Sequence, residues 1–594
     1  MAALFTTPKR NDTTAGTHVA EPDVRRRIGL AHGSWRRVTR RIVAGAVCAL
    51  TVSSLLMPSV SLAAEWVKVG GNKYNTAASD EAGTWSWDGA DDLKLNNYNG
   101  GEIQAAGKLN VNYSGTNIVT AEWIESINVS HGTNENAELN IQGDEGGTLS
   151  VTSTEDAILS TGNINIDGAG SVNATSTGFD AINAGGDLAI KGSGNVNATG
   201  ASDGIRANGN ITIDDSGAIT ARATKDKGIG ADKNLTIKGG GTVEASSADG
   251  EALWSSGNIN ISDGSQVKAS SEKDAAVEAK GSLAATNASL NVNGVEYGVY
   301  AHKGITLDHA NATVRASKGK YGGANALFTY QDDIVVKNGS TVDAFAEGEV
   351  SAAFSTRNDR PNEKGGHIYI SDSVVKAIAR YVENGDGPIP YSENQDGETR
   401  REPQGENIGI IAQTSEGVTP AVISIIRSKV TAEGDTAAIF ARAMSADGKT
   451  IGTIKIENAA IQTPEGGKVI DYRKLRDGIY EAGQAIGTGD ATVDSLYIKA
   501  VAKSTTIAPP EVAKPEDPKP DETKPAESKP AESKQNPKPE GSKPTKAVAA
   551  STTKAKTTGV LAATGDTSGA AIVATVLAGT AAIAAGTMAS RKRS

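Results

Sequence analysis

The sequence predicts an all-β protein built as a parallel β-helix, in which short strands wind into stacked three-sided coils. Three observations support this fold class. A phrase of about 24 residues recurs along the chain, each phrase holds three strand-like pieces, and Gly is abundant while aromatic residues are scarce. Of 594 residues, 68 are Gly and only 4% are aromatic. This composition suits many short strands joined by tight turns better than one large globular core.

The repeat is clearest in two consecutive units, NITIDDSGAITARATKDKGIGADK and NLTIKGGGTVEASSADGEALWSSG, which begin at Asn210 and Asn234. Each unit contains three apolar-alternating pieces of three to five residues, with Gly, Asn, Asp and Ser between them. A fixed period of this size indicates a solenoid, because each coil can bury its inner face only against its neighbours. In the first unit the residues expected to point inward are Ile211, Ile213, Ile219, Ala221, Ile229 and Ala231.

A column of polar residues precedes the first strand of the coils. Asn163, Asn210, Asn234 and Asn258 align in it, and Asp187 takes the same position in one coil. Stacked Asn side chains can hydrogen-bond from coil to coil, and the Gly before most of them can adopt a positive φ. We interpret this column as structural.

Residues 65–131 carry the densest group of aromatic residues. Because a solenoid needs its open end covered, we expect this segment to be an N-terminal cap that merges into the first coils. A platform on which sugar rings stack is the alternative. The aromatic residues are Trp85, Trp87, Tyr98 and Tyr113.

The β-helix is predicted for residues 132–505, with less regular coils after Gly304. Two insertions, at 356–366 and 382–406, interrupt the pattern, and the second is rich in Pro, Gly, Glu and Asn. Solenoids accommodate such insertions at their corners.

Residues 1–63 have the features of a secretion signal. An Arg-rich segment precedes the apolar run RIVAGAVCALTVSSLLMPSVSLAA, and small residues allow cleavage after Ala63 or Ala64. Both general secretion and twin-arginine export are open. The one cysteine, Cys48, lies in this signal, so the exported chain would hold neither disulfides nor cysteine-bound metals.

Residues 506–560 are dominated by Pro, Lys and Glu, and KPAES occurs twice in succession. Such a segment has almost nothing apolar to bury, so we expect a disordered, extended linker that spans the cell wall.

Residues 561–594 resemble a sortase cell-wall sorting signal. A short LAATG motif precedes an apolar run of about 20 residues, which is long enough for one transmembrane helix, and the tail RKRS follows. The motif is similar to the LAxTG form of high-GC Gram-positive bacteria. The resemblance implies that a sortase cleaves the Thr564–Gly565 bond and joins the protein to the cell-wall envelope. A plain C-terminal membrane anchor is the alternative. The motif residues are Leu561, Ala562, Ala563, Thr564 and Gly565.

The phrases SDGIRANGNITI and FDAINAGGDLAIKGSG resemble the repeats of carbohydrate-binding domains of bacterial surface proteins. The resemblance is clearest over residues 132–304. It implies a pectate-lyase-like, right-handed parallel β-helix that binds acidic polysaccharide and calcium.

Asp156, Asp180 and Asp203 occupy equivalent positions in consecutive coils, where stacked strands lie about 4.8 Å apart. Lys227 interrupts this acidic column and Glu251 follows it. The sequence leaves two interpretations open. The carboxylates could bind Ca²⁺, which prefers oxygen ligands, or each could cap its own turn through backbone N–H groups.

The function predicted from these features is that of a non-enzymatic surface adhesin or carbohydrate-binding protein on a wall-anchored stalk. A net charge of −11 argues against nucleic acid as a partner. The expected partners are sortase, the cell-wall envelope and an acidic polysaccharide or host glycan, with Ca²⁺ as the only cofactor considered. A polysaccharide lyase or glycosidase and a purely structural stalk are the alternatives. The histidines of the predicted solenoid lack metal-site spacing and are expected at corners or on the surface: His131, His302, His309 and His367.

Overall fold

The computed structural model describes residues 63–121, 127–130, 137–319, 322–360, 365–382, 406–476, 479–489 and 501–510. All of them belong to the first of two compact units, which spans residues 1–512. Their regular structure consists of strands β1 to β48, and none of them forms a helix that could cross a membrane. The predicted secretion signal up to residue 62, most of the linker, and the sorting signal with its hydrophobic helix lie outside the described residues.

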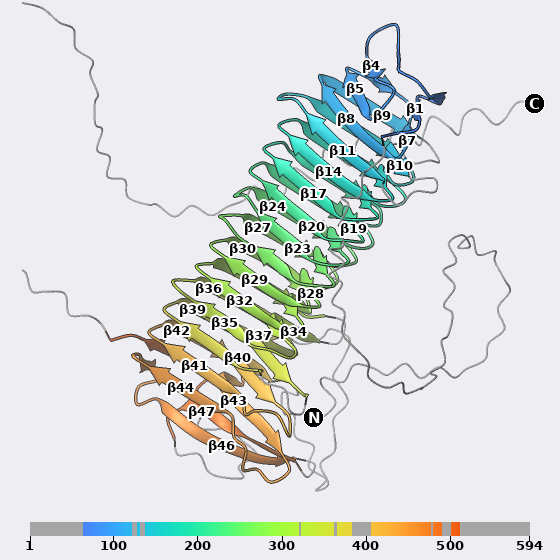
Figure 1. Cartoon of the computed structure of the whole chain (residues 1–594). Coiled ribbons are helices and arrows are strands. Elements are labelled where there is room, and N and C mark those ends of the chain that lie inside the picture. The colour runs from blue at the N-terminus through green and yellow to red at the C-terminus, as the bar shows by residue number, and fades with distance from the viewer. Residues whose placement is uncertain are drawn as a thin grey trace, which may run out of the picture. The chain divides into compact units, whose positions relative to one another are not determined.

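Three long sheets make up the unit, and Figure 1 shows their strands stacked as successive rungs along one axis. Through most of the stack, the chain passes from sheet A to sheet C to sheet B and returns to sheet A one coil further on. Hydrogen-bonded neighbours in a sheet are therefore usually three strands apart in the sequence.

Sheet A contains β3 (Ala78–Ser79), β4 (Trp85–Trp87), β5 (Asp92–Asn96), β8 (Lys108–Ser114), β11 (Glu138–Gly143), β14 (Asn163–Gly168), β17 (Leu188–Gly192), β20 (Ile211–Asp215), β23 (Leu235–Lys238), β26 (Ile259–Ile261), β29 (Ser282–Thr286), β32 (Gly304–Asp308), β35 (Ile334–Lys337), β38 (Ile368–Ser371), β41 (Val422–Ile426) and β44 (Thr453–Glu457).

Sheet B contains β1 (Val67–Val69), β2 (Asn72–Tyr74), β7 (Ile103–Ala106), β10 (Ile127–Ser130), β13 (Ile158–Ser160), β16 (Ile182–Ala184), β19 (Ile205–Ala207), β22 (Ile229–Ala231), β25 (Leu253–Ser255), β28 (Val277–Ala279), β31 (Tyr297–Ala301), β34 (Gly323–Thr329), β37 (Val350–Asn358), β40 (Asn407–Thr414), β43 (Ala437–Ser445), β46 (Lys468–Arg476) and β47 (Ile479–Gly487).

Sheet C contains β6 (Asn99–Gly100), β9 (Thr116–Ala121), β12 (Thr148–Ser153), β15 (Ser171–Ser176), β18 (Val196–Gly200), β21 (Ala218–Ala223), β24 (Thr242–Ser247), β27 (Gln266–Ser271), β30 (Ser289–Val295), β33 (Asn311–Ser317), β36 (Thr341–Gly348), β39 (Val374–Tyr381), β42 (Lys429–Gly434), β45 (Ala460–Thr463) and β48 (Ser504–Ala508).

Strands in the body of the stack pair in parallel, with equivalent residues of successive coils in register. Ile211, for example, pairs with Leu188 of the preceding coil and with Leu235 of the following one. The predicted all-β fold of stacked parallel strands is therefore confirmed at this level, and the arrangement is consistent with a β-helix solenoid.

The apolar core runs through the interior of the coils. Strands β20, β21 and β22 coincide with the three pieces predicted for one repeat unit. Their inward residues are at most 1% exposed, as the alternation of apolar and polar residues predicted: Ile211, Ile213, Ile219, Ala221, Ile229 and Ala231.

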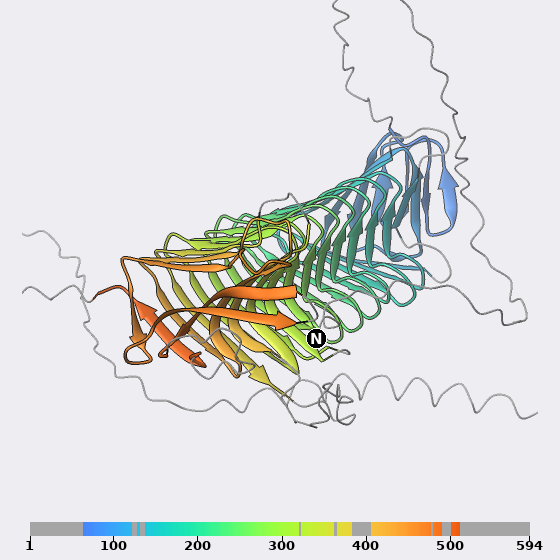
Figure 2. The ribbon, with the colours of Figure 1, turned by 90° about the horizontal axis from the view of Figure 1, so that it is seen from below.

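Both ends of the stack change from parallel to antiparallel pairing. At the N-terminal end β1 pairs with β2 and β7, and β3, β4 and β5 form antiparallel pairs. At the C-terminal end β46 and β47 form a hairpin against β43, and β48 pairs with β42 and β45 (Figure 2). Strand β48 continues to Ala508, past residue 505, where the β-helix was predicted to end and after which the linker was predicted to begin.

The aromatic side chains of the N-terminal segment pack into the core. This arrangement agrees with a cap and leaves the rings unavailable as a stacking platform for sugars. At most 7% of each residue is exposed: Trp85, Trp87, Tyr98 and Tyr113.

The solenoid continues across both predicted insertions. Residues 356–358 extend β37 rather than opening the first insertion, and β38 then pairs in parallel with β35. After the second insertion, β40 pairs in parallel with β37.

The Asn column forms a hydrogen-bonded ladder along one corner of the coils. The Oδ1 atom of Asn163 accepts the backbone N–H of Asp187 at 2.8 Å, and the Oδ1 atom of Asp187 accepts that of Asn210 at 2.7 Å. Asn210 and Asn234 continue the pattern with the backbone N–H groups of the next coils, at 3.2 and 2.9 Å.

The glycines before this column do not have the positive φ that we predicted. A Cβ atom at Gly186, Gly209 or Gly257 would instead collide with the side-chain oxygen of the preceding coil's ladder residue. Glycine is therefore required here because the ladder brings two coils into close contact.

Candidate functional site

Asp156, Asp180 and Asp203 lie at the corner that leads into sheet B, one in each of three consecutive coils. The Oδ1 atom of Asp156 accepts the backbone N–H of Asp180 at 2.9 Å, and Asp180 does the same for Asp203, also at 2.9 Å. Asp203 then accepts the backbone N–H of Lys227 at 2.6 Å. The predicted column exists, but each carboxylate caps the next coil rather than its own turn.

Two further side chains separate these carboxylates. The Nδ2 atom of Asn183 donates to Asp156 at 3.1 Å and to Asp180 at 2.9 Å, and the Arg206 guanidinium lies 3.4 Å from Asp203. Burial, together with the neighbouring carboxylates, raises the pKa of Asp180 and raises that of Asp203 to about 6. Amide and guanidinium groups thus occupy the outer oxygens of the column.

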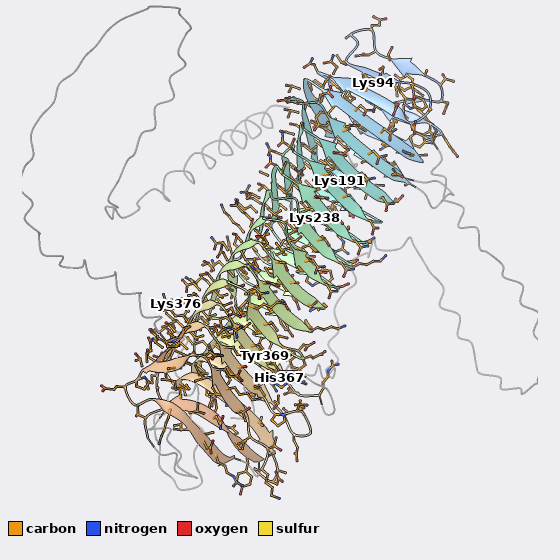
Figure 3. All side chains as sticks on the ribbon, turned by 60° about the vertical axis from the view of Figure 1, so that its left-hand side comes forward. Lys94, Lys191, Lys238, His367, Tyr369 and Lys376 are labelled. Carbon is orange, nitrogen blue, oxygen red and sulfur yellow. The ribbon has the colours of Figure 1, made fainter. Side chains whose placement is uncertain are left out.

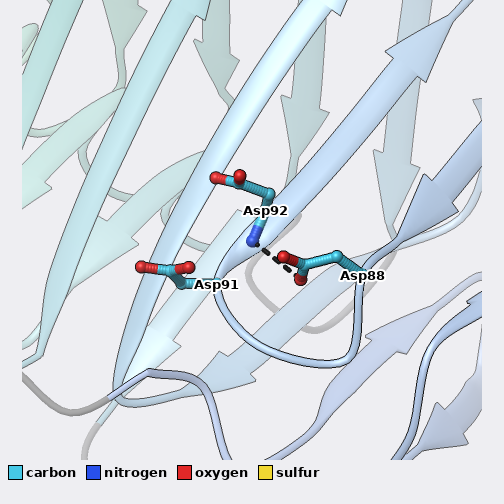
Figure 4. Close-up of side chains that lie close together, drawn as sticks. All are labelled: Asp88, Asp91 and Asp92. Atoms are coloured by element: carbon cyan, nitrogen blue, oxygen red, sulfur yellow. Dashed lines mark hydrogen bonds between the residues drawn. The ribbon is translucent and has the colours of Figure 1, made fainter.

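One trio of acidic side chains in the described ranges has ligand atoms within 4.8 Å of one another, and it is Asp88, Asp91 and Asp92. These residues lie at the turn before β5, where Asp88 accepts the backbone N–H of Asp92 at 3.2 Å (Figure 4). The Asp156–Asp203 column does not form such a group, and its oxygens accept hydrogen bonds from backbone and amide donors. Calcium at the column remains a prediction.

Lys227 interrupts the acidic column, as the sequence predicted, and links it to an aromatic residue. Its ammonium group pairs with Asp226 and lies 5.3 Å from the centre of the Trp254 ring. In the next coil Glu251 returns an acidic side chain to this corner.

Glu251 and Glu278 form a hydrogen-bonded carboxyl pair on the outer face of sheet B. Glu278 also pairs with Lys280 and lies 3.2 Å from Nε2 of His302. Burial, reinforced by the hydrogen bond with Glu278, raises the pKa of Glu251 to about 7. Burial alone would raise the pKa of Glu278, but hydrogen bonds from His302, Glu251 and Lys280 outweigh it and lower the pKa to about 2.

Aromatic rings flank this pair along the sheet. Trp254, Glu278, Tyr300 and Phe328 occupy one outward-facing register position in β25, β28, β31 and β34. Trp254 and Tyr300 are partly exposed, whereas Glu278 and Phe328 are buried. We call these four residues, with the adjacent Glu251 and His302, the sheet B track.

The rings of the track are held by further stacking. Tyr300 stacks on His302, with centroids 4.4 Å apart and an interplanar angle of 20°, and on Tyr297, at 4.9 Å and 26°. Phe328 contacts both Tyr297 and Tyr300. The outer face of these coils thus carries a group of contacting rings around one ionised carboxylate.

A small pocket adjoins the track beyond Phe328, where Ser355, Ile411 and Gln413 line it with Arg442. Its volume of about 30 Å³ is room for roughly one water molecule. The buried Arg442 guanidinium donates to Glu406 at 2.7 Å and to Gln413 at 2.8 Å. The positive charge of Arg442 is therefore balanced by the carboxylate of Glu406.

The Glu251–Glu278 pair does not have the spacing of the two carboxyl groups of a glycosidase. Glycosidases place their two carboxyl groups about 5–9.5 Å apart, whereas those of Glu251 and Glu278 are in direct hydrogen-bond contact. Among the described histidines, His309 pairs with Asp308 at a corner, and buried His367 accepts the backbone N–H of Val422 at 3.1 Å. His131 lies outside the described residues.

The sequence singled out Glu251 and His302 but did not place them together, and it missed Trp254, Glu278 and Tyr300. A signal was available, because these residues take the outward middle position of the third strand in successive repeat units. Large aromatic and acidic side chains are unusual at that position in a chain whose outward residues are mostly small and polar.

Both residues of the predicted cleavage site are among the described residues. Ala63 forms an isolated bridge with Lys108, and Ala64 is 5% exposed. The sorting motif at residues 561–565 lies outside the described residues.

Comparison of the chain with protein-family models, with curated proteins and with solved structures finds no match. The geometry of the solenoid faces therefore carries the functional argument.

Proposed function

We propose that this protein is a non-enzymatic, glycan-binding surface protein, exported and anchored to the cell wall of a Gram-positive bacterium. The secretion signal, the Pro-rich linker and the LAATG sorting signal support this assignment from the sequence, with sortase as the processing partner. We also propose that the β-helix is right-handed, because nearly all crossovers between parallel β-strands are right-handed.

The observation that carries the proposal is the sheet B track. Partly exposed Trp254 and Tyr300 flank Glu278 on one face, and His302 lies against both Glu278 and Tyr300. Aromatic faces pack against the apolar faces of sugar rings, while carboxylate and imidazole groups exchange hydrogen bonds with hydroxyl groups. The track combines both kinds of contact.

The charge around the track bears on the ligand. Carboxyl groups of Glu251, Glu278 and Asp274 act on one another electrostatically, while Lys227 and Lys280 are each already paired with a carboxylate. An anionic ligand would find mainly negative charge here. We therefore propose an uncharged glycan for this face, in preference to the acidic polysaccharide that the family resemblance implies.

A glycan array probed with the purified full chain tests the proposal. The double variant Trp254→Ala/Tyr300→Ala should bind its glycan about tenfold more weakly or worse, because the stacking contacts are lost. Phe179→Ala is the matched control, since Phe179 is an aromatic residue outside the track and is 52% exposed.

Two outcomes would contradict the proposal. A full chain that binds no glycan would favour a purely structural stalk. Release of reducing sugar or of unsaturated uronide from a bound polysaccharide would favour a glycosidase or a lyase instead.

A further inference from the structure

The outer face of sheet A is hollowed along the solenoid axis, on a different side of the coils from the sheet B track. One hollow has a volume of about 620 Å³ and runs across β14, β17, β20, β23 and β26. Two more hollows, of about 500 and 490 Å³, continue along the same sheet toward β5 and β4. We call the first of these hollows the sheet A groove.

The floor of the groove follows from the side chains at one register position. Asn165, Ala189, Thr212, Thr236 and Asn260 pair in succession in neighbouring strands. The three central residues are short, so the floor is lowest over β17, β20 and β23. With about 4.8 Å between strands, the floor extends for roughly 19 Å.

Longer side chains form the two walls. One wall is the Asn ladder, whose residues come two positions before the floor residues in each coil. The other wall contains Lys191. Asp214 and Lys238 occupy the equivalent positions in the next two coils and form an ion pair at 2.8 Å. Figure 3 shows Lys94, Lys191 and Lys238 spaced along this face. The ladder residues of the first wall are Asn163, Asp187, Asn210, Asn234 and Asn258.

The chemistry of the groove is polar and nearly balanced in charge. Amide and hydroxyl groups provide both donors and acceptors, and no aromatic side chain lines the groove. The lining includes one carboxylate, Asp187, and one ammonium group, Lys191. The groove would therefore neither attract nor repel a neutral chain, and it offers hydrogen bonds along its whole length.

We propose that the sheet A groove is a second, independent binding face, which takes an extended, uncharged, hydroxyl-rich polysaccharide lying parallel to the solenoid axis. A chain of that kind presents hydroxyl groups at short, regular intervals, and the groove presents a polar ladder residue in every coil, an amide in four coils and the Asp187 carboxylate in the fifth. With two independent faces on different sheets, one molecule can hold two separate glycan chains.

Affinity electrophoresis of the full chain tests this proposal, with a soluble mixed-linkage β-glucan and a galactomannan as neutral probes and polygalacturonate as the charged comparison. Thr212→Trp fills the floor of the groove. Thr220→Trp is the matched control, because Thr220 is an outward, partly exposed residue of β21 in the same coil but on sheet C. Trp254→Ala reports on the sheet B track.

We expect Thr212→Trp to weaken retention by a neutral polymer about tenfold or more, while Thr220→Trp and Trp254→Ala retain the parent's affinity for it. A second pair of variants adds no bulk. Asn165→Ala should weaken retention and Asn197→Ala should not, although each removes a 2.8 Å amide–amide hydrogen bond, to Asn140 on sheet A and to Asn173 on sheet C respectively.

Three results would overturn the inference. The first is retention of the parent by polygalacturonate alone. The second is equal loss in Thr212→Trp and Thr220→Trp. The third is loss of neutral-polymer binding in Trp254→Ala with full binding in Thr212→Trp. This last result would leave the sheet B proposal standing and remove only the groove.

Discussion

The carboxyl groups of Glu251 and Glu278 share a hydrogen bond on the outer face of sheet B, although the two residues come from successive coils. One member of the pair holds a proton and the other is ionised, because two charged carboxylates in contact would repel. The pair makes the stability of the solenoid depend on pH in a direction that can be worked out.

The folded-state pKa of Glu251 is raised from its usual 4.5 to about 7, so between these values the folded chain holds a proton that the unfolded chain has released. Stability is therefore greatest below about pH 4.5 for this group and falls as the pH rises toward 7. Asp203, whose pKa is raised to about 6, adds in the same direction. Glu278, whose pKa is lowered to about 2, acts in the opposite sense below pH 4.5.

We expect the thermal unfolding temperature of the full chain to decrease between pH 5 and pH 7.5 and to vary less in Glu251→Gln, in which the titrating group is gone. Circular dichroism melts at several pH values measure this. Glu244→Gln is the control, since Glu244 is exposed on sheet C beside Arg222. If Glu251→Gln and Glu244→Gln showed the same slope as the parent, the carboxyl pair would not be coupled to folding.

The core predicts a sharp contrast between neighbouring residues of β20. Ile211→Asp/Ile213→Asp places two charges in a dry interior, at a cost of several kcal/mol each, whereas Thr212→Asp places one on the outer face. We expect the double variant to lose its cooperative melt and Thr212→Asp to keep it. A double variant that melted like the parent would mean that Ile211 and Ile213 do not point inward.

The acidic ladder is expected to stabilise the corner before sheet B. Asp203→Ala removes the acceptor of the Lys227 N–H and the partner of Arg206, so it should cost about 1–3 kcal/mol. Asp203→Asn keeps an acceptor oxygen and should cost less. Chemical denaturation of both variants measures the difference, and equal losses would contradict the capping role.

The same column decides the calcium prediction. Calorimetry with Ca²⁺ on the full chain and on Asp180→Asn/Asp203→Asn separates the two interpretations. A heat present in the parent and absent in the variant would place the ion at the column. Equal heats in the parent and the variant would show that Ca²⁺ does not bind at the column and that its carboxylates serve only as hydrogen-bond acceptors.

The strands of each coil were predictable from the sequence because the same apolar alternation recurs in many repeat units. Each inward Ile or Ala recurs one coil later, and the register then follows from the period. The role of the glycines beside the Asn ladder was not predictable. A Cβ atom at position 209 would collide with a side-chain oxygen of Asp187, and that residue belongs to the preceding coil.

The sheet B track was hard to predict for a similar reason. Glu251 and Glu278 meet only after the chain has completed a coil, and the hydrogen bond between them depends on rotamers that a repeat pattern does not specify. The column of Asp156, Asp180 and Asp203 was visible, but its hydrogen-bond partners belong to the following coil. Alignment of repeats gives the positions of side chains and not their contacts.

Processing at both ends follows from the proposed surface display. Mass spectrometry of protein released from the cell wall should find an N-terminus at Ala64 or Glu65 and a C-terminus at Thr564 joined to an envelope component. In a strain without sortase the chain should keep residues 565–594. A wall-released protein that still carries the RKRS tail would exclude sortase processing and favour a membrane anchor.

The repeat also predicts that one coil can be removed. Ile211 pairs with Leu188 before it and Leu235 after it, so deleting residues 210–233 would set Leu235 against Leu188 with every inward residue still inward. Asp203 would then meet the backbone N–H of Glu251 in place of that of Lys227. Deleting residues 210–221 removes only part of a coil and would put the end of β21 and the corner after it in the place of β20. We expect β-rich circular dichroism and a cooperative melt, with a modestly lower midpoint, for the first deletion and neither for the second. If both deletions unfolded the chain, the coils would not be the interchangeable units that their register indicates.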